Sequence, residues 1–312
     1  MEIYSSVDNL SKNNIESSSL TIGTFDGMHL GHQHLIKELI GFALNNNNKS
    51  IIITFNPNPY SVINKDSVAN YSLISNNDKY EILDSLGVDV LMEIPFDLNI
   101  SKILATNFLE DFIVSPFKPK DIIIGYDHHF GYKREGDSNF LTKNSKKYGY
   151  SLHVVAPFKK DDRIISSSMI RKKIAKNDIL SVNDSLGRSY KITGSIVKGN
   201  SVGRSISFPT ANVSLSSISQ IIPANGVYLI KAYINSDKYM GMCNIGYRPT
   251  ISDGESRTVE VHLFDYSKFD LYGEVIEIEF INYIRSEMKF GSKEELKGQL
   301  IKDKEYCKSL II

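Results

Sequence analysis

Two histidines lie three positions apart in a glycine-rich segment near the N-terminus. Residues 23–32 read Gly-Thr-Phe-Asp-Gly-Met-His-Leu-Gly-His, which places His29 and His32 beside the last of three glycines. Glycines let a backbone approach a ligand closely, and a helix beginning here would offer unpaired N–H groups to an anion. Paired imidazoles suit a site that stabilises charge on a phosphorus atom under attack. The segment is therefore a candidate phosphate site.

A second candidate phosphate-binding segment occurs later in the same half of the chain. Residues 165–171 read Ile-Ser-Ser-Ser-Met-Ile-Arg and are expected to begin a helix. Either Ser167 or Ser168 can cap that helix, and Arg171 lies on its first turn. Hydroxyls, backbone amides and a guanidinium could then converge on one phosphate group.

Each of these segments also has an explanation without chemistry. A glycine-rich turn with two surface histidines is common, and a serine cap beside a solvated arginine is an ordinary helix start. Zinc binding by His29, His32 and His34 has no support from a cysteine or from a second cluster of ligands. The occurrence of both segments together favours the phosphate site.

Residues 188–212 combine glycines, basic residues and side-chain oxygens. Glycines adjoin basic residues twice, at Lys198, Gly199, Gly203 and Arg204. A flexible basic loop of this kind can fold over nucleotide phosphates. Thr210 and Asn212 share one face of an extended segment and could offer oxygens to Mg²⁺. Taken alone, this segment is explained more simply as a β-hairpin.

A carboxylate lies on an alternating segment farther along the chain. In residues 258–264, every second residue from Val259 is apolar, while Glu260, His262 and Phe264 occupy the other face. A carboxylate beside an aromatic ring could act as a general base for a hydroxyl group of an apolar substrate. A solvent-facing glutamate on the outside of a barrel is the alternative interpretation.

The elements expected to position the first two segments alternate between strand and helix. Strands are predicted at 20–23, 51–55, 88–94 and 122–124, and helices at about 31–44, 78–86, 100–114, 167–176 and 178–185. The continuous apolar run at 51–55 is typical of a strand buried in a parallel sheet. Such alternation predicts a doubly wound, Rossmann-like α/β domain, with the histidine loop at the carboxyl end of a strand.

After Gly187 short alternating segments replace this pattern. Strands are predicted at 191–197, 226–232, 239–245, 258–264 and 274–280, followed by an amphipathic helix over about 292–311. Turn residues separate the strands, as in an antiparallel β-barrel or sandwich. We therefore expect a domain boundary within residues 184–188, which divides the chain into an N-terminal domain of residues 1–185 and a C-terminal domain of residues 186–312.

Composition is consistent with a two-domain protein of the cytoplasm. The chain has 312 residues, enough for two domains, and its 36 basic and 36 acidic residues give no indication of a nucleic-acid or membrane partner. Cys243 and Cys307 are not spaced as zinc ligands and indicate a reducing compartment. The first 19 residues lack a signal-peptide pattern, and no apolar run approaches the roughly 20 residues of a membrane span.

The two phosphate segments together resemble a known family. HxGH after a strand with a late ISSSxIR resembles the HIGH-type nucleotidyltransferases, and GTFDGMHLGH resembles the adenylyltransferase domain of bacterial bifunctional riboflavin kinase/FAD synthetases. Residues 54–59 (TFNPNP) and 125–131 (GYDHHFG) resemble that family's TFxPHP and GxDFxFG. The residues that the resemblance assigns to the ATP phosphates are His29, His32, Ser168 and Arg171. It also implies that Asp127 lies in the nucleotide and flavin cleft; Asn58 departs from the family's usual histidine.

The second half resembles the riboflavin kinase module. The resemblance rests on residues 188–212, on VEVHLFDY at 259–266, and on 270–273 and 285–290. It implies that Thr210 and Asn212 serve the Mg–ATP site, and that Glu260 activates the riboflavin 5′-hydroxyl. Arg285 matches an arginine expected near the flavin. Ser207 stands where the family generally has glycine.

The function implied by both resemblances is phosphorylation of riboflavin to FMN, followed by adenylylation of FMN to FAD with release of pyrophosphate. ATP is the co-substrate, with Mg²⁺ or another divalent metal ion. The residues expected at the ATP phosphates, besides the histidines and arginine above, are Gly23, Phe25, Asp26, Gly27, Gly31, Ser167, Ser168, Lys198, Gly199, Gly203 and Arg204. Those expected in the flavin and nucleotide cleft are Asn58, Asp127, Phe264 and Arg285.

Two other functions fit parts of this pattern. One domain could catalyse while the other only binds flavin, or both sites could be degenerate in a flavin-binding regulatory protein. The intact set His29, His32, Thr210, Asn212 and Glu260 favours catalysis, because binding alone does not require a catalytic base.

Overall fold

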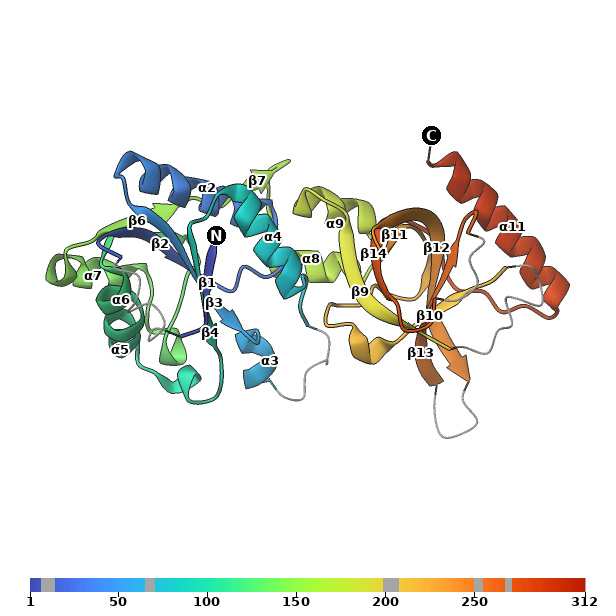
Figure 1. Cartoon of the computed structure of the whole chain (residues 1–312), viewed down its shortest axis with the longest axis horizontal. Helices are drawn as coiled ribbons and strands as arrows, with labels where there is room; N and C mark the ends of the chain where they lie inside the picture. The colour runs from blue at the N-terminus through green and yellow to red at the C-terminus, as the bar shows by residue number, and fades with distance from the viewer. Residues whose placement is uncertain (7–14, 65–70, 199–207, 250–254, 267–270, 312) are drawn as a thin grey trace. The chain divides into compact units, whose positions relative to one another are not determined.

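The fold is taken from a computed structural model, which describes residues 1–6, 15–64, 71–198, 208–249, 255–266 and 271–311 (Figure 1). The chain forms two compact units. The first comprises residues 1–69 and 76–167, and the second comprises residues 70–75 and 168–312. Each unit is described by itself.

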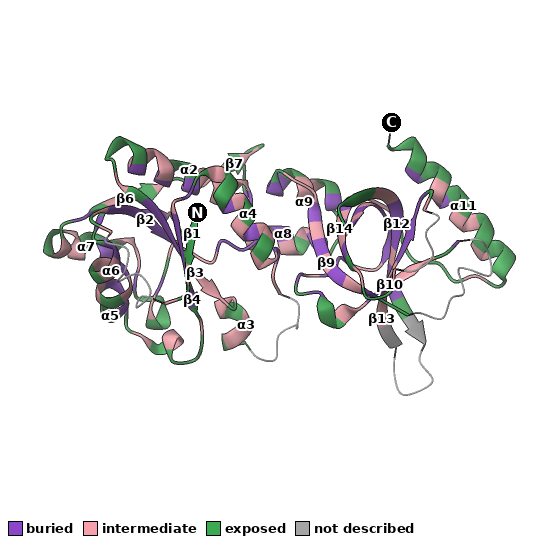
Figure 2. Ribbon diagram, viewed as in Figure 1, coloured by how far each residue is buried: buried purple, intermediate pink, exposed green. Residues whose placement is uncertain are grey.

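A six-stranded parallel sheet is the centre of the first unit, with the strand order β1-β4-β3-β2-β5-β6. The strands are β1 (Glu2–Tyr4), β2 (Ser18–Ile22), β3 (Lys49–Asn56), β4 (Val90–Pro95), β5 (Pro119–Gly125) and β6 (Ser151–Val155). All five residues of β2 are buried, as are residues 50–54 of β3 (Figure 2). Strands covered on both faces explain the continuous apolar runs, and the predicted Rossmann-like sheet is confirmed.

The helices of the first unit include α2 (Leu30–Asn45), α3 (Pro59–Ile63), α4 (Asn76–Leu86), η3 (Tyr132–Arg134) and α7 (Ser138–Tyr148). The helix predicted over residues 100–114 begins later than expected. After the separate turn η1 (Ile100–Lys102), the helical backbone runs without a break through α5 (Ala105–Phe108), the π-helix η2 (Leu109–Val114) and α6 (Ser115–Phe117). Ile103 and Leu104 have ψ angles of 127° and 149°, so the backbone becomes extended between η1 and α5.

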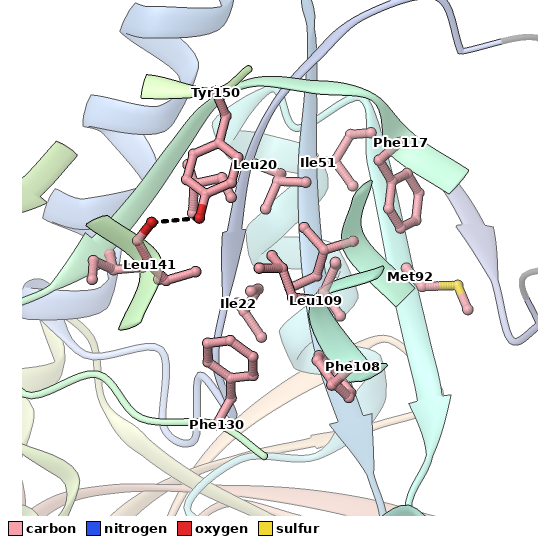
Figure 3. Packing of buried hydrophobic residues seen from close by; sticks show 14 of the residues in the cluster. Leu20, Ile22, Ile51, Met92, Phe108, Leu109, Phe117, Phe130, Leu141 and Tyr150 are labelled. Carbon is pink, nitrogen blue, oxygen red and sulfur yellow. Dashed lines mark hydrogen bonds between the residues drawn. The ribbon is translucent and has the colours of Figure 1, made fainter. Parts of the chain in front are cut away.

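One apolar cluster packs the short helices against the sheet. Leu20 and Ile51 from the central strands pack with Leu109 and Phe117, and all four side chains are fully buried (Figure 3). At the edge of this cluster the Tyr150 hydroxyl donates a hydrogen bond of 2.6 Å to a backbone carbonyl oxygen. The cluster packs on the strands whose carboxyl ends lead into the predicted site.

A closed antiparallel barrel forms most of the second unit, with the strand order β10-β13-β12-β11-β14-β9. The strands are β9 (Tyr190–Val197), β10 (Ala211–Val213), β11 (Gly226–Ile234), β12 (Asp237–Pro249), β13 (Glu255–Leu263) and β14 (Val275–Arg285). Buried residues alternate along β9 and β14, as expected when one face lines a barrel interior. The short helix η4 (Leu215–Ser217) follows β10, and α11 (Lys293–Ser309) is the predicted terminal helix.

Two short helices precede the barrel, α8 (Ser167–Ile174) and α9 (Ile179–Leu186). The sequence placed both at the end of the first domain, but from Ser168 onward they belong to the second compact unit. Asn183 of α9 shows why: its Nδ2 donates to the Phe280 carbonyl oxygen at 2.8 Å, and its Oδ1 accepts from the Tyr190 N–H at 2.7 Å. Packing thus divides the chain near residue 167, whereas the division of activity within residues 184–188 stays a prediction.

Two further strands, β7 (Lys159–Lys160) and β8 (Arg163–Ile164), form a small antiparallel ribbon before α8. Within the described ranges, no helix combines the length and the apolar character that a membrane span requires.

Candidate functional sites

The histidine loop connects the carboxyl end of β2 to the first turn of α2. Phe25, Gly27 and Met28 have φ angles of 46°, 84° and 42°, in the left-handed region. For residues other than glycine that conformation costs about 1–2 kcal/mol. The side chains of Phe25 and Met28 are almost fully buried, so packing within the unit stabilises the loop in this shape.

The two imidazoles lie together at the start of α2. His29 is the N-cap residue, and its Nδ1 accepts a hydrogen bond of 3.2 Å from the His32 backbone N–H. The two rings stack with centroids 3.6 Å apart and an angle of 18° between their planes. Because Nδ1 accepts, the neutral His29 ring carries its proton on Nε2.

Gly31 makes room for this arrangement. A Cβ atom at that position would lie 3.1 Å from His29 Nδ1 and 3.4 Å from the Ile165 carbonyl oxygen. A larger residue would therefore push the His29 ring away from its position. The close approach accounts for the glycine between the two histidines.

Ser167 stabilises the loop from another part of the first unit. Its Oγ donates a hydrogen bond of 2.8 Å to the backbone carbonyl oxygen of Asp26, which is itself buried. The sequence predicted that Ser167 or Ser168 caps the helix. That capping role stays a prediction, since α8 begins at Ser167 itself. The contact in the structure ties residues 165–167 to the histidine loop.

Arg171 and Ser168 belong to the second unit, where Arg171 contacts a residue that sequence reasoning missed. Its guanidinium carbon lies 3.9 Å from the ring centroid of Tyr71, and its Nε donates to the Tyr71 carbonyl oxygen at 3.3 Å. Tyr71 lies in the segment 70–75, which joins the second unit through a hydrogen bond of 2.8 Å from the Ile221 N–H to the Ser72 carbonyl oxygen. No motif marks Tyr71 in the sequence. Convergence of Ser168 and Arg171 with the histidines on one phosphate stays a prediction.

Asn58, which replaces the family's histidine, has a local structural role. It is the N-cap of α3, where its Oδ1 accepts a hydrogen bond of 3.0 Å from the Tyr60 backbone N–H. An asparagine at this position therefore shapes the backbone after β3.

The segment after β5 carries Asp127 on the surface and the half-buried His128 imidazole next to it, with a buried Nε2 atom. Burial lowers the pKa of His128 to about 4, and the positive charges of His129 and Arg134 act in the same direction. His128 stands where the family pattern has phenylalanine. Because it is neutral near pH 7, it occupies that position as an uncharged ring.

In the barrel, the structure aligns Glu260 with two asparagines. Asn212 of β10 is its direct partner on one side, and Asn244 of β12 is its direct partner on the other. Directly opposed residues of antiparallel strands point to the same face, with Cα atoms about 4.5–5.5 Å apart. Three polar side chains therefore share one face across three strands. Sequence reasoning missed Asn244, because strand register is not visible in one strand alone.

His262 links the same strand to the segment that contains Thr210. Its Nδ1 lies 2.9 Å from the Pro209 carbonyl oxygen, so that Nδ1 carries a proton and donates it. Burial lowers the pKa of His262, and the hydrogen bond to Pro209 opposes that effect only in part. The contact sets the position of the backbone immediately before Thr210.

Phe264 lies in an apolar cluster between the barrel and α11. The buried members of that cluster are Val227, Leu229, Met242, Phe264 and Cys307. The Lys304 ammonium lies 5.4 Å from the Phe264 ring centroid. A role for this ring in binding flavin stays a prediction.

Arg285 fastens α11 to the end of β14. Its Nε lies 3.0 Å from both carboxylate oxygens of the buried Asp303, and its Nη2 donates to Asp303 Oδ2 at 2.7 Å. Gln299 donates a further hydrogen bond of 2.8 Å to the same carboxylate. A contact between Arg285 and flavin stays a prediction.

Part of the predicted basic loop is described. The exposed Lys198 ammonium lies 5.7 Å from the Tyr272 ring centroid. The other residues named for that loop lie outside the described residues: Gly199, Gly203, Arg204 and Ser207.

His34, the third histidine weighed as a zinc ligand, packs against an aromatic residue: the centroids of the His34 and Phe158 rings are 5.6 Å apart. Among the side chains that the structure describes, no group of three or more His, Cys, Asp or Glu residues could hold a metal ion.

Comparison with known proteins identifies relatives of both halves. The family model for FAD synthetase matches residues 11–169, and the model for riboflavin kinase matches residues 186–311. A Haemophilus influenzae protein named bifunctional riboflavin kinase/FMN adenylyltransferase is 37% identical over 297 residues, which cover 95% of this chain and 94% of that protein. A Bacillus subtilis protein of the same name is 34% identical over 291 residues, covering 92% and 90%.

A solved structure is similar over the whole chain. It is a Streptococcus pneumoniae protein described as a macrolide-efflux protein, with a TM-score of 0.85, 27% sequence identity and coverage of 99% of both chains. The two proteins therefore share their fold.

Proposed function

The chain belongs to the family of bifunctional riboflavin kinase/FMN adenylyltransferases, and from that premise we propose which residues carry the two reactions. It is an enzyme that phosphorylates riboflavin to FMN and then adenylylates FMN to FAD, with ATP as the co-substrate of both steps. The observation that carries this function is the succession of two family domains in one chain.

In adenylyl transfer, an oxygen of the FMN phosphate attacks the α-phosphorus of ATP in line. The new O–P bond forms as the bond to the leaving pyrophosphate breaks. The FMN phosphate is already a nucleophile near neutral pH, so the reaction needs no strong base. His29, His32 and Arg171 stabilise the negative charge of the transition state, together with Ser168 and amides at the start of α2. The stacked histidine rings at a helix N-terminus support this assignment.

In riboflavin phosphorylation, Glu260 accepts the proton of the 5′-hydroxyl as its oxygen attacks the γ-phosphorus of ATP. The bond between the γ-phosphorus and the β–γ bridging oxygen breaks, and ADP leaves. The half-buried position of Glu260 next to Asn212 supports this role, because it places a base beside a group proposed to serve Mg–ATP.

Thr210 and Asn212, of which Asn212 is the direct strand partner of Glu260, fit a magnesium ion by their chemistry. Thr210 contributes a hydroxyl oxygen and Asn212 an amide oxygen, which are hard donors of the kind that Mg²⁺ prefers. Thr210 and Asn212 would hold the ion, whose positive charge would stabilise the ATP phosphates. Another divalent ion with the same preference for oxygen could replace it.

We further assign residues 1–185 to adenylyl transfer and 186–312 to the kinase reaction. The ends of the two family matches, at residues 169 and 186, support this division. The proposed substrates are the small molecules riboflavin, FMN and ATP, and the proposed location is the cytoplasm.

A chromatographic time course with riboflavin, ATP and Mg²⁺ tests the bifunctional assignment. We expect FMN to appear first and FAD to follow. Accumulation of FMN without FAD in excess ATP would show that only the kinase half is active. No conversion of either flavin would favour a binding protein over an enzyme.

A further inference from the structure

A buried lysine lies next to the histidine loop and has no part in the two reactions described above. Lys79, on the first turn of α4, has only 6% of its surface exposed. Lysine is almost never fully buried unless it is paired, because removing an ammonium group from water costs free energy. Its position therefore requires an explanation.

The Lys79 ammonium acts on the backbone of the loop. Its Nζ donates a hydrogen bond of 3.4 Å to the carbonyl oxygen of Thr24. The Thr54 hydroxyl donates to the same oxygen at 3.3 Å. Thr24 is thus held by two side chains, one from α4 and one from β3.

Two carboxylates offset part of the cost of burying the Lys79 ammonium. Burial lowers the pKa of Lys79, while the negative charges of Asp26 and Glu93 raise it and favour the ammonium form. Glu93 is itself fixed by hydrogen bonds to its Oε2 from the Tyr80 hydroxyl at 2.7 Å and from Asn56 Nδ2 at 3.0 Å. Asp26 lies on the loop, so the lysine interacts with the loop through a charge as well as through a hydrogen bond.

The loop needs such support because of its conformation. Thr24 directly precedes Phe25, the first of the left-handed residues, and lies five positions before His29. Strained backbone persists only when the surrounding structure holds it. A shift at Thr24 would pass through the loop to the histidine ring, where a misplacement of about 1 Å can cost about 100-fold in rate.

We propose that Lys79 is a positioning residue for adenylyl transfer, which holds Thr24 and Asp26 so that His29 and His32 are correctly placed at the phosphates. The proposal rests on the role assigned above to the two histidines. Lys79 contacts the loop rather than the substrates, so its removal should lower kcat for FAD formation more than it raises KM for ATP.

The test compares Lys79→Met with Lys102→Met, which removes an exposed lysine of the same unit. We expect Lys79→Met to lower kcat for FAD formation at least tenfold, and Lys102→Met to leave it within twofold. Phosphorylation of riboflavin should be unchanged in both variants. Lys79→Arg, which keeps a charged donor, should recover part of the lost rate.

A double-mutant cycle with Thr54→Val measures whether the two donors act through the same carbonyl group. We expect non-additive effects of Lys79→Met and Thr54→Val on kcat for FAD formation. If Lys79→Met does not fold, Lys79→Arg and Thr54→Val carry the test, and wild-type rates in both would overturn the proposal. Unchanged FAD formation in folded Lys79→Met, or equal losses in both activities, would also overturn it.

A matched His29→Ala variant separates failure of this inference from failure of the proposed function. If His29→Ala loses FAD formation while Lys79→Met keeps it, only the positioning role is wrong. If His29→Ala forms FAD as fast as the wild type, the assignment of the loop to the phosphates is wrong. The proposal for Lys79 is then wrong as well.

Discussion

Asn212 and Glu260 are direct partners on neighbouring antiparallel strands of the barrel. The proposed metal ligand and the proposed general base are therefore held at a separation set by the β10–β13 ladder. A slip of one residue would move Asn212 to the opposite face of the sheet and separate the two groups. The short strand β10 is hydrogen-bonded to β13 on one side and to β9 on the other, because the barrel is closed. Pairing on both sides fixes the register of β10 and with it the position of Asn212 relative to Glu260.

Loss of the Thr210 hydroxyl should weaken the kinase reaction through the metal ion. Mutation of a residue that only hydrogen-bonds to a metal ligand already lowers metal affinity or activity by about 10–100-fold. We expect Thr210→Val to lower FMN formation at least tenfold and to raise the Mg²⁺ concentration needed for half-maximal rate. Titration of Mg²⁺ in the riboflavin assay checks this.

The matched control is Thr193→Val, since Thr193 lies on β9 opposite Glu277, away from Glu260 in the strand register. It should not change the Mg²⁺ requirement. An identical Mg²⁺ titration for wild type and Thr210→Val would contradict the assignment of Thr210.

Restoring the family's histidine at position 58 should change little. Asn58 caps α3 with its side-chain oxygen, so its contribution is to the shape of the backbone. We expect Asn58→His to alter the rate of FAD formation by less than fivefold, equivalent to about 1 kcal/mol at the barrier. Asn58→Ala, which removes the cap, should destabilise the segment by about 1 kcal/mol. A gain above fivefold in Asn58→His would instead indicate a catalytic role for the histidine.

The lowered pKa of the half-buried His128 predicts a loss of stability in acid. In the unfolded chain its pKa is about 6.5, but burial lowers it to about 4 in the folded protein. The unfolded state therefore binds more protons between these values, and stability falls as the pH decreases from about 6.5 to 4. At most this amounts to a loss on the order of 3 kcal/mol.

Replacement of His128 by phenylalanine should remove this contribution. We expect the Tm of the first unit to decrease less between pH 7.5 and pH 5 in His128→Phe than in the wild type. Equal decreases would show that the His128 ring accepts a proton in the folded protein.

Truncation should separate the two activities, but the stability of the C-terminal fragment should depend on the residue at which it begins. A fragment of residues 186–312 lacks Asn183, whose side chain bonds to the backbone of β14 and β9. A fragment of residues 168–312 keeps it. We expect both to convert riboflavin to FMN when folded, with a Tm at least about 4 °C higher for the longer fragment. Circular dichroism measures folding and Tm, and a folded fragment without kinase activity would contradict the assigned boundary.

The sequence predicted the fold well because its signals are local. The apolar run at residues 51–55 identified a buried parallel strand, and the alternating segments after Gly187 identified an antiparallel domain. The start of the helix predicted over 100–114 was wrong, because its apolar spacing does not reveal that the backbone becomes extended at Ile103 and Leu104.

The parts of the sites that sequence reasoning missed depend on contacts between distant residues. Tyr71 and Arg171 are 100 positions apart, and Lys79 and Thr24 are 55 apart. Asn244 lies beside Glu260 only because of the β12–β13 register. Tyr71, Lys79 and Asn244 belong to none of the motifs recognised in the sequence. Their relation to the sites follows from tertiary structure alone.

Two single-site variants, each assayed with riboflavin and with FMN, test the central claim that one chain carries two separate active sites. We predict that His29→Ala converts riboflavin to FMN at the wild-type rate and forms FAD about 10²–10³-fold more slowly. Glu260→Gln should bind riboflavin without phosphorylating it, because the amide cannot accept the hydroxyl proton, yet convert supplied FMN to FAD normally. If either variant lost both activities while folded, or kept both, the two-site account would be contradicted.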